Sequence, residues 1–464
     1  MGMDEVPPPE AFEPEPYAPS TADRLRRRLQ VALILILVAS LVVLAAVQSG
    51  GLISTTADGE EPDPRLAVVD AAGALTWMDG RGGSPVGYSQ TGLVFQFPAW
   101  SPDGTRIAAV GSNADGGGVY VVPARAPTDP PAEPALIYQS ADRPPFYLYW
   151  TPDGRQVSFL TTEPEGLALR VAPADGTGSA YVVRSGAPMY WDFIDPDRML
   201  VHSGSSGPDE FFGEVGLDGA PFAGTDRSAG TFRAPVVSAD GRYRAYLSSA
   251  TDPIGEVVRE SRADAGTTRI RVFGAGALAF SPDGDALAFL AADQPTSAAL
   301  PLPVGPLRIL DANASEPRTL IEGNVVAFFW SPTGREIAVL QLPAPENPVT
   351  EAGSRPAAVL ARATVAAPRV EEIATGVSLE LSVVEIAAGA IRSHRAVRVS
   401  DLFVNQVLPF FDQYALSHRF WSPNGDSLIL PIVGDGDLTE LHVIPADGSD
   451  SSVVAIAEMG FWSP

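Results

Sequence analysis

One short turn pattern recurs along this chain and restricts its possible folds more than any other feature. In each copy an aromatic or apolar residue leads into Ser or Thr, then Pro, Asp and Gly, and an alternating apolar stretch follows. Five clear copies begin at Trp100, Trp150, Phe280, Trp330 and Trp421, and two degraded copies begin at Phe193 and Val237. The chain is therefore built largely from repeats of one small unit.

The residues of the repeat are those that reverse a backbone. Pro102 fixes φ near the value needed at the second position of a type I turn, Asp103 suits the third position, and Gly104 accepts the positive φ that follows. Beyond the turn, residues 106–111 alternate between two faces, which predicts a strand. A single hairpin cannot bury both of its faces, so such units become stable by packing against copies of themselves.

The spacing of the copies predicts the size of the packed unit. Between Ser101 and Ser331 successive copies are 43 to 50 residues apart, which is the length of one four-stranded propeller blade. The step from Ser331 to Ser422 is 91 residues long and holds no further copy. Residues 343–375 within it are rich in Pro, Ala and Glu without clean periodicity, so we interpret them as an insertion in one blade.

A second pattern, a strand that ends in a small-residue turn, gives an independent count. Its eight copies start near Leu75, Val119, Leu167, Glu214, Glu256, Leu307, Leu381 and Leu441. The second pattern comes first in the chain, at residues 66–81, whereas residues 461–464 are a turn pattern with nothing after it. This arrangement predicts an all-β, eight-bladed propeller closed by pairing of its N- and C-terminal strands, with a seven-bladed ring as the alternative.

An apolar stretch between the turn patterns at Trp330 and Trp421 differs from the repeats. Residues 400–417 carry several Leu, Val and Phe without the alternation of a strand. We interpret the stretch as a short helix or cap packed on the propeller. Pro409 is expected to interrupt it, because a proline lacks the N–H that a helix interior needs.

The repeat resembles that of the TolB-like propellers, which are built from WD40-like Pd repeats and share the aromatic-Ser-Pro-Asp-Gly turn seen at Trp100–Gly104 and Phe280–Gly284. The resemblance covers residues 66–464 and is confined to the repeats. It implies a propeller fold. Propellers of this family serve as binding scaffolds, as sensors and as companions to hydrolase domains, so the resemblance implies a shape more than a function.

The amino-terminal region predicts an attachment to a membrane. Residues 31–47 carry no charge and are mostly Leu, Ile and Val, which predicts a transmembrane helix over residues 29–48. Four arginines precede it within residues 24–28, and the next basic residue after it is Arg65, so the positive-inside rule places the N-terminus in the cytoplasm. A cleaved signal peptide is the alternative, although the preceding segment is long for one.

The predicted organisation is that of a single-pass membrane protein. Residues 1–28 form a Pro- and Glu-rich cytoplasmic tail, expected to be disordered, that ends in the arginine collar. Residues 49–64 are a linker after the helix. Residues 65–464 form the propeller, which is then extracytoplasmic, at the cell membrane.

Composition excludes several chemistries. All 31 basic residues are arginine and there is no cysteine, so Schiff-base lysines, thiol nucleophiles, thiolate metal sites and disulfides are excluded. The arginine-only, Ala- and Pro-rich composition hints at a GC-rich bacterial genome. A formal charge of −25 argues against nucleic acid as a partner, because phosphates would be repelled.

Few residues remain that could carry a reaction. The four histidines, His202, His394, His418 and His442, have no spacing that suggests a shared metal site, and Asp435-Gly436-Asp437 lacks the ligand series of a calcium loop. The serines after His202 lie in no nucleophile elbow. The repeated tryptophans are expected to pack between sheets. We therefore predict no catalytic, cofactor-binding or metal-binding residue, no cofactor, and a protein that is not an enzyme.

Three functional hypotheses follow from this organisation. The leading one is a membrane-anchored extracytoplasmic scaffold that binds a protein, a peptide, an envelope polymer or another ligand. The second is a sensory ectodomain that signals through its single helix. The third is a propeller hydrolase or lyase in which acidic side chains from several blades converge in the central channel.

Overall fold

The computed structural model describes residues 64–464 with gaps. These gaps are residues 89, 91, 127, 130–132, 165, 205–209, 225–233, 252–253, 265, 293–302, 344–376 and 435–437. The predicted tail, transmembrane helix and nearly all of the linker lie outside the described residues, and so does almost all of the predicted insertion at 343–375. Within the part of the chain that is described, no helix is long and apolar enough to cross a bilayer.

The turn pattern forms the same hydrogen-bonded turn at almost every copy. The Gly104 N–H donates to the Ser101 carbonyl oxygen at 2.9 Å, and the Ser101 hydroxyl donates to the Asp103 carboxylate at 2.6 Å. Gly104 has a φ of 66°, which is why a glycine is needed there. The turn glycines of the other copies are alike, with φ of 67° at Gly154, 68° at Gly241, 73° at Gly284, 67° at Gly334 and 76° at Gly425.

Each turn joins two strands of an antiparallel meander. The first sheet combines both ends of the described chain, in the order β28 (Met459–Trp462), β1 (Arg65–Val69), β2 (Leu75–Asp79) and β3 (Val86–Tyr88). The second consists of β4 (Val94–Trp100), β5 (Arg106–Asn113), β6 (Gly116–Pro123) and β7 (Ala135–Ser140). The third consists of β8 (Pro145–Trp150), β9 (Gln156–Glu163), β10 (Gly166–Pro173) and β11 (Tyr181–Ser185), and the fourth of β12 (Met189–Asp195), β13 (Arg198–Ser203) and β14 (Phe211–Gly216).

The rest of the repeats are linked by hydrogen bonds into one thirteen-stranded sheet. Its strands are β15 (Val236–Val237), β16 (Tyr243–Thr251), β17 (Ile254–Ser261), β18 (Thr267–Phe280), β19 (Ala286–Ala292), β20 (Gly305–Asp311), β21 (Arg318–Trp330), β22 (Glu336–Gln341), β23 (Val377–Glu385), β24 (Ala390–Val399), β25 (Ser427–Val433), β26 (Thr439–Pro445) and β27 (Ser452–Ile456). The 14-residue strand β18 pairs with β17 through its first half and with β19 through its second half. A strand this long connects one repeat to the next, so the thirteen-stranded sheet is still composed of units of the repeat's length.

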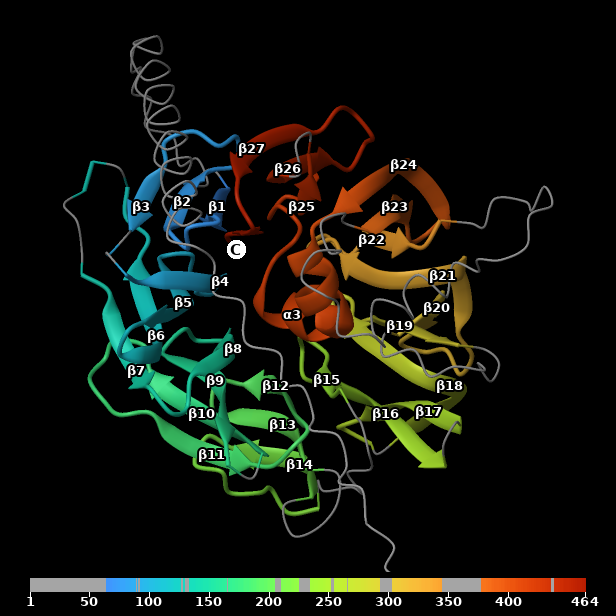
Figure 1. Cartoon of the computed structure of the whole chain (residues 1–464). Coiled ribbons are helices and arrows are strands. Elements are labelled where there is room, and N and C mark those ends of the chain that lie inside the picture. The colour runs from blue at the N-terminus through green and yellow to red at the C-terminus, as the bar shows by residue number, and fades with distance from the viewer. Residues whose placement is uncertain are drawn as a thin grey trace, which may run out of the picture. The chain divides into compact units, whose positions relative to one another are not determined.

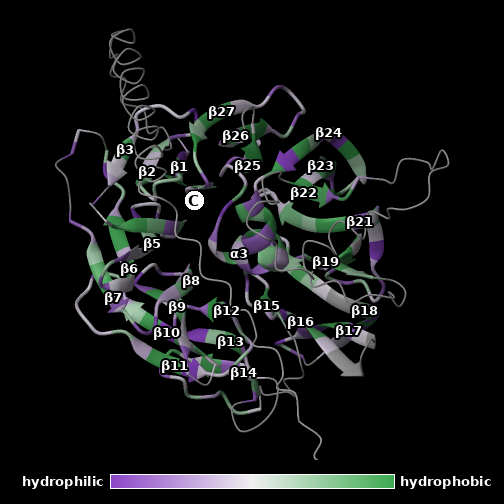
Figure 2. Cartoon of the chain, viewed as in Figure 1, coloured by the Kyte–Doolittle hydropathy of each residue, from purple (hydrophilic) through white to green (hydrophobic). Residues whose placement is uncertain are grey.

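The two ends of the described chain pair as the sequence predicts. Strand β28 runs antiparallel to β1, with Leu66 opposite Trp462 and Val69 opposite Met459. The eight strands predicted by the second sequence pattern are also present, as β2, β6, β10, β14, β17, β20, β23 and β26. The structure is thus nearly all β within the described residues, and Figure 2 shows that its strands are largely hydrophobic.

The tryptophans of the turn pattern connect neighbouring repeats. The indole N–H of Trp150 donates to the carbonyl oxygen of Ala99, the residue before Trp100, at 2.9 Å. The same bond recurs between other neighbours, from Trp100 to Phe461 at 3.1 Å, from Trp330 to Ala279 at 3.2 Å and from Trp421 to Phe329 at 2.9 Å. The predicted packing between sheets is therefore confirmed, and a regular hydrogen bond accompanies it.

A helical segment lies among the innermost strands. It consists of the π-helical turn η1 (Phe403–Val407), the 3₁₀ turn η2 (Leu408–Phe410) and the short helix α3 (Phe411–Ser417), and we call residues 403–417 the central segment. Figure 1 shows the sheets following one another around α3, and α3 contacts β8, β18 and β21. Pro409 lies in η2, where the helix changes type, so the predicted interruption is confirmed.

The inter-sheet hydrogen bonds of the tryptophans are expected to contribute measurably to the stability of the fold. The change Trp421→Phe removes the bond to Phe329 and keeps most of the ring. The change Trp462→Phe is a matched control, because the Trp462 indole nitrogen is buried without a hydrogen-bond partner among the described residues. We expect Trp421→Phe to lower the free energy of unfolding in urea by about 1–2 kcal/mol more than Trp462→Phe does. Equal losses would show that these bonds contribute nothing.

Candidate functional site

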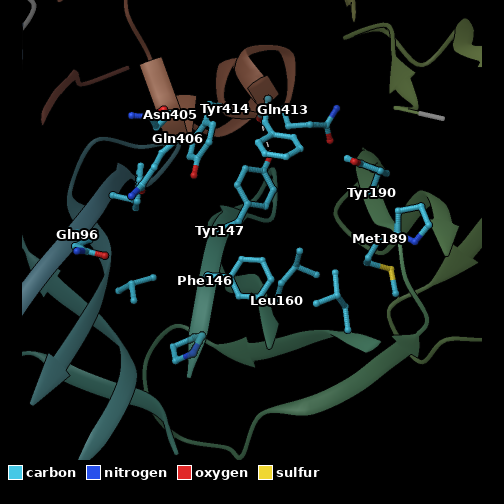
Figure 3. A pocket seen from close by; sticks show the side chains of 16 residues that line it. Gln96, Phe146, Tyr147, Leu160, Met189, Tyr190, Asn405, Gln406, Gln413 and Tyr414 are labelled. Atoms are coloured by element: carbon cyan, nitrogen blue, oxygen red, sulfur yellow. Dashed lines mark hydrogen bonds between the residues drawn. The ribbon is translucent and has the colours of Figure 1, made fainter. Parts of the chain in front are cut away.

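Two cavities lie against the central segment. The first, with a volume of about 440 Å³, opens between the central segment and the strands β4, β8 and β12. We call it the aromatic pocket, and Figure 3 shows the side chains that surround it. Its walls include Phe97, Phe146, Tyr147, Met189, Tyr190 and Tyr414.

Two distortions of the inner strands shape this pocket. Phe97 in β4 and Tyr147 in β8 have positive φ angles of 49° and 45°, and each lies at a register shift of its strand. Positive φ is costly for a bulky residue and persists only where surrounding contacts hold it. Here the contacts come from Tyr414 of the central segment, which stacks on Phe97 at 5.2 Å and meets Tyr147 edge-on at 5.3 Å. The two distorted strands therefore pack against the central segment through these rings.

Gln413 places a polar group inside this apolar space. Its side chain is 3% exposed, and neither its amide nitrogen nor its amide oxygen has a hydrogen-bond partner among the described residues. The amide also slightly favours the ionised form of Asp412, but it forms no hydrogen bond of ordinary length with it. An unpartnered buried polar group costs roughly 1–3 kcal/mol of stability. Such a group requires a partner that the described residues do not supply, such as a bound water molecule or a ligand.

The second cavity, with a volume of about 890 Å³, is lined by the aromatic and proline residues of the turn pattern and by the other side of the central segment. We call it the turn-side cavity. Among the carboxyl groups that line it, two are buried, Asp192 from β12 and Asp412 from α3. They come from distant parts of the chain, and the fold brings both to this cavity.

Burial changes the acidity of both carboxyl groups. It raises the pKa of Asp192 to about 7, although the Val237 N–H and the Tyr149 hydroxyl, at 2.7 Å and 3.1 Å, favour the ionised form. Burial likewise raises the pKa of Asp412 to about 7. Groups that titrate near neutral pH can hold or release a proton under physiological conditions. The turn-side cavity is therefore lined by two buried carboxyl groups whose pKa values are raised toward neutral pH.

His418 lies beside the same cavity in a neutral state. Burial lowers its pKa to about 4. One ring nitrogen lies 2.7 Å from the Ser417 hydroxyl and the other 3.4 Å from the Phe97 carbonyl oxygen. Because that carbonyl can only accept, Nε2 is the donor and Nδ1 accepts from Ser417. His418 thus fixes the end of the central segment against the bulge of β4.

The structure does not bring the histidines of the sequence together. His202 stacks on Tyr190 at 6.1 Å, His394 lies 2.9 Å from the Ser382 hydroxyl, and His442 lies 3.1 Å from Glu440. In the described ranges no three His, Asp or Glu side chains lie close enough to hold a metal ion. Asp435-Gly436-Asp437 lies outside those ranges, and the serine-containing stretch after His202 is described only in part.

The turn aspartates have the structural role expected of them. The Ser281 hydroxyl and the Asp285 N–H hold the pKa of Asp283 below its usual value, because both donate hydrogen bonds to its carboxylate. Thr151 and the N–H of Arg155 bind the carboxylate of Asp153 in the same way. These carboxylates stabilise turns, and those of Asp103 and Asp283 are not part of either cavity.

Sequence reasoning missed the residues that define the two cavities. Asp192 stands between Trp191 and Phe193, and Asp412 and Gln413 stand between Phe411 and Tyr414. A lone polar residue among large apolar neighbours was the available signal, because such a residue is carried into the interior by the residues around it. The positive φ angles of Phe97 and Tyr147 had no comparable signal.

No family model matches the chain, and no curated protein matches it. Similar solved structures include the dihydro-heme d1 dehydrogenase NirN in complex with DHE, with a TM-score of 0.51 and 14% identity over 88% of this chain and 77% of that chain. TolB from Acinetobacter baumannii has a TM-score of 0.34 and 18% identity over 56% of this chain and 64% of that chain. An oligogalacturonate lyase in complex with manganese has a TM-score of 0.43 and 10% identity over 86% of each chain. The likeness to NirN supports a β-propeller fold.

These comparisons correct one prediction, that the protein is not an enzyme. The similar structures include enzymes, with NirN among them, so a propeller of this kind does not exclude catalysis. The prediction rested on the lack of a contiguous catalytic motif. In a propeller, however, groups from distant parts of the chain can line one cavity, as Asp192 of β12 and Asp412 of α3 do here, and they leave no contiguous motif in the sequence.

The raised pKa values predict how stability depends on pH. Between the ordinary aspartate pKa of 3.8 and a folded-state pKa of about 7, the folded protein keeps protons that the unfolded chain releases. Raising the pH through this window therefore favours unfolding. We expect the free energy of unfolding in urea to fall by roughly 1–4 kcal/mol for each buried carboxyl between pH 4 and pH 7.

Asparagine variants identify the groups responsible. Asp192→Asn and Asp412→Asn should each reduce the pH dependence between pH 4 and pH 7. Asp283→Asn is the control, because another copy of the turn carries Asn424 at this position and the lowered pKa of Asp283 acts only below that window. A wild-type protein that becomes more stable from pH 4 to pH 7 would refute this assignment.

Proposed function

We propose that this chain is a ligand-binding propeller whose aromatic pocket takes a small, uncharged, largely apolar molecule. The observation that carries the proposal is the composition of the pocket. Its lining consists of apolar, aromatic and amide side chains, and no Asp, Glu, Arg or His of the described residues contributes to it. A charged ligand would find no counter-charge there, whereas an aromatic ring can pack against Phe97, Phe146 or Tyr147.

We propose further that the repeats form eight blades of a closed ring. Support comes from the β28–β1 pairing and from the eight strands of the second sequence pattern. In such a ring the blades hold one another in place, which keeps the bulged strands β4 and β8 at the distance from the central segment that the pocket requires. The scaffold therefore carries a ligand site of fixed shape.

The location of the protein is part of the same proposal. We propose that residues 29–48 anchor it in the cell membrane, with residues 1–28 in the cytoplasm and the propeller outside. The arginine collar at 24–28 and the uncharged stretch after it support this arrangement. A protein, a peptide or an envelope polymer is then a further candidate partner for the faces of the propeller, and signalling through the helix is an alternative use of the same architecture.

A second candidate function is hydrolysis or elimination at the turn-side cavity. The observation that favours it is the presence of Asp192 and Asp412 in one cavity with pKa values of about 7. One carboxyl could act as a base and the other as an acid. Binding in the aromatic pocket stays the leading proposal, because the described lining of that pocket is uncharged throughout and so selects one chemical class of ligand.

Ligand binding can be tested with indole, a neutral aromatic probe, by calorimetric titration of the full-length protein in lipid nanodiscs. Leu167 lines the pocket, and Leu167→Trp is expected to fill it and to weaken indole binding at least tenfold. Leu136→Trp makes the same change at an exposed site on β7 and should leave binding unaltered. The proposal fails if the wild type gives no more heat than empty nanodiscs.

The proposed topology predicts a separate result. Full-length protein should sediment with membranes, and a protease added to intact spheroplasts should digest the propeller but not a tag fused to residue 1. Deletion of residues 29–48 should abolish sedimentation. Protection of the propeller from external protease would contradict the proposed orientation.

A further inference from the structure

Gln413 differs from the other amides of the aromatic pocket. Four amide side chains line it, and Gln96, Asn405 and Gln406 are exposed and can bind water, whereas Gln413 is 3% exposed. Both polar atoms of its side chain are without a hydrogen-bond partner in the described part of the chain. In Figure 3 this side chain extends from the central segment toward the wall formed by Met189 and Tyr190.

Two side chains, those of Tyr147 and Asp412, hold the backbone of Gln413 in place. The Tyr147 hydroxyl donates to its carbonyl oxygen at 2.5 Å, and its N–H donates to the Asp412 carboxylate at 3.0 Å. Tyr147 is itself fixed by ring contacts with Trp191 at 5.3 Å and with Tyr414. The amide is therefore presented from a rigid support, as a group that selects a ligand must be.

The chemistry of this amide defines what it can select. A primary amide presents an N–H donor beside a C=O acceptor, and an uncharged group that satisfies both at once is another amide with its own N–H and C=O on the same side. A cyclic amide, or lactam, has that arrangement. The surrounding rings require the rest of the ligand to be planar and apolar, and the uncharged lining excludes an ion.

We infer that Gln413 is the specificity-determining residue of the aromatic pocket, and that the ligand is a planar, uncharged ring system carrying a lactam that pairs with the Gln413 amide through two hydrogen bonds. This inference rests on the proposed function and narrows it. A ring without the lactam N–H leaves the amide oxygen buried and unpaired, so the site discriminates against it.

The test compares 2-quinolone with 1-methyl-2-quinolone, which keeps the ring and the carbonyl but lacks the N–H. Both are titrated into the full-length protein in lipid nanodiscs, with indole as the reference. The wild type should bind 2-quinolone at least tenfold more tightly than the methylated compound. Gln413→Leu should reduce this ratio to about one while indole still binds. Gln139→Leu, the same change at an exposed amide of β7 outside the pocket, should preserve the ratio.

The possible results separate the inference from the proposal beneath it. Failure of the wild type to bind indole or either quinolone overturns the proposed function. Binding of all three with no preference for 2-quinolone overturns the inference alone. A preference that survives in Gln413→Leu also overturns it, because another group is then responsible. If Gln413→Leu does not fold, the wild-type ratio of affinities for 2-quinolone and 1-methyl-2-quinolone still shows whether the site selects a lactam or any apolar ring.

Discussion

The hydrogen bond from a tryptophan at the end of one inner strand to the backbone of the next is the interaction on which the rest of this structure depends. Sheets that pack face to face can slide past one another, because apolar contact has no direction. A bond from Trp150 to Ala99, repeated from Trp421 to Phe329, removes that freedom. It aligns the inner strands at equal depth, so that their side chains meet around one centre.

One of the copies that lack this bond has a different connection in its place. In the copy that begins at Val237, valine replaces the aromatic residue and offers no indole N–H. There the connection runs through a carboxylate, with the Val237 N–H donating to Asp192 at 2.7 Å. This replacement lowers the stability of the fold, because burying a charged carboxylate is unfavourable, whereas an indole is neutral at every pH. The same side chain that replaces a structural link thus brings a titratable group to the turn-side cavity.

The sequence was sufficient for features that depend on local physics. The turn at Ser101–Gly104 and the strand after it follow from the conformational preferences of four residues, and the pairing of β28 with β1 follows from the order of the two patterns. The aromatic pocket could not be predicted in this way. The pocket depends on positive φ angles at Phe97 and Tyr147, and neither position has a glycine that would predict them. It also depends on the position of the central segment, which is determined by contacts with strands hundreds of residues away in the sequence.

The central segment gives the two cavities a physical connection. Asp412 and Gln413 are consecutive residues of one helix, where successive side chains point about 100° apart, so one faces the turn-side cavity and the other the aromatic pocket. The Gln413 amide is one of the groups that favour the charged form of Asp412. A ligand that engages this amide as inferred above would remove that support, so that occupancy of the aromatic pocket and the charge of Asp412 in the turn-side cavity would be linked.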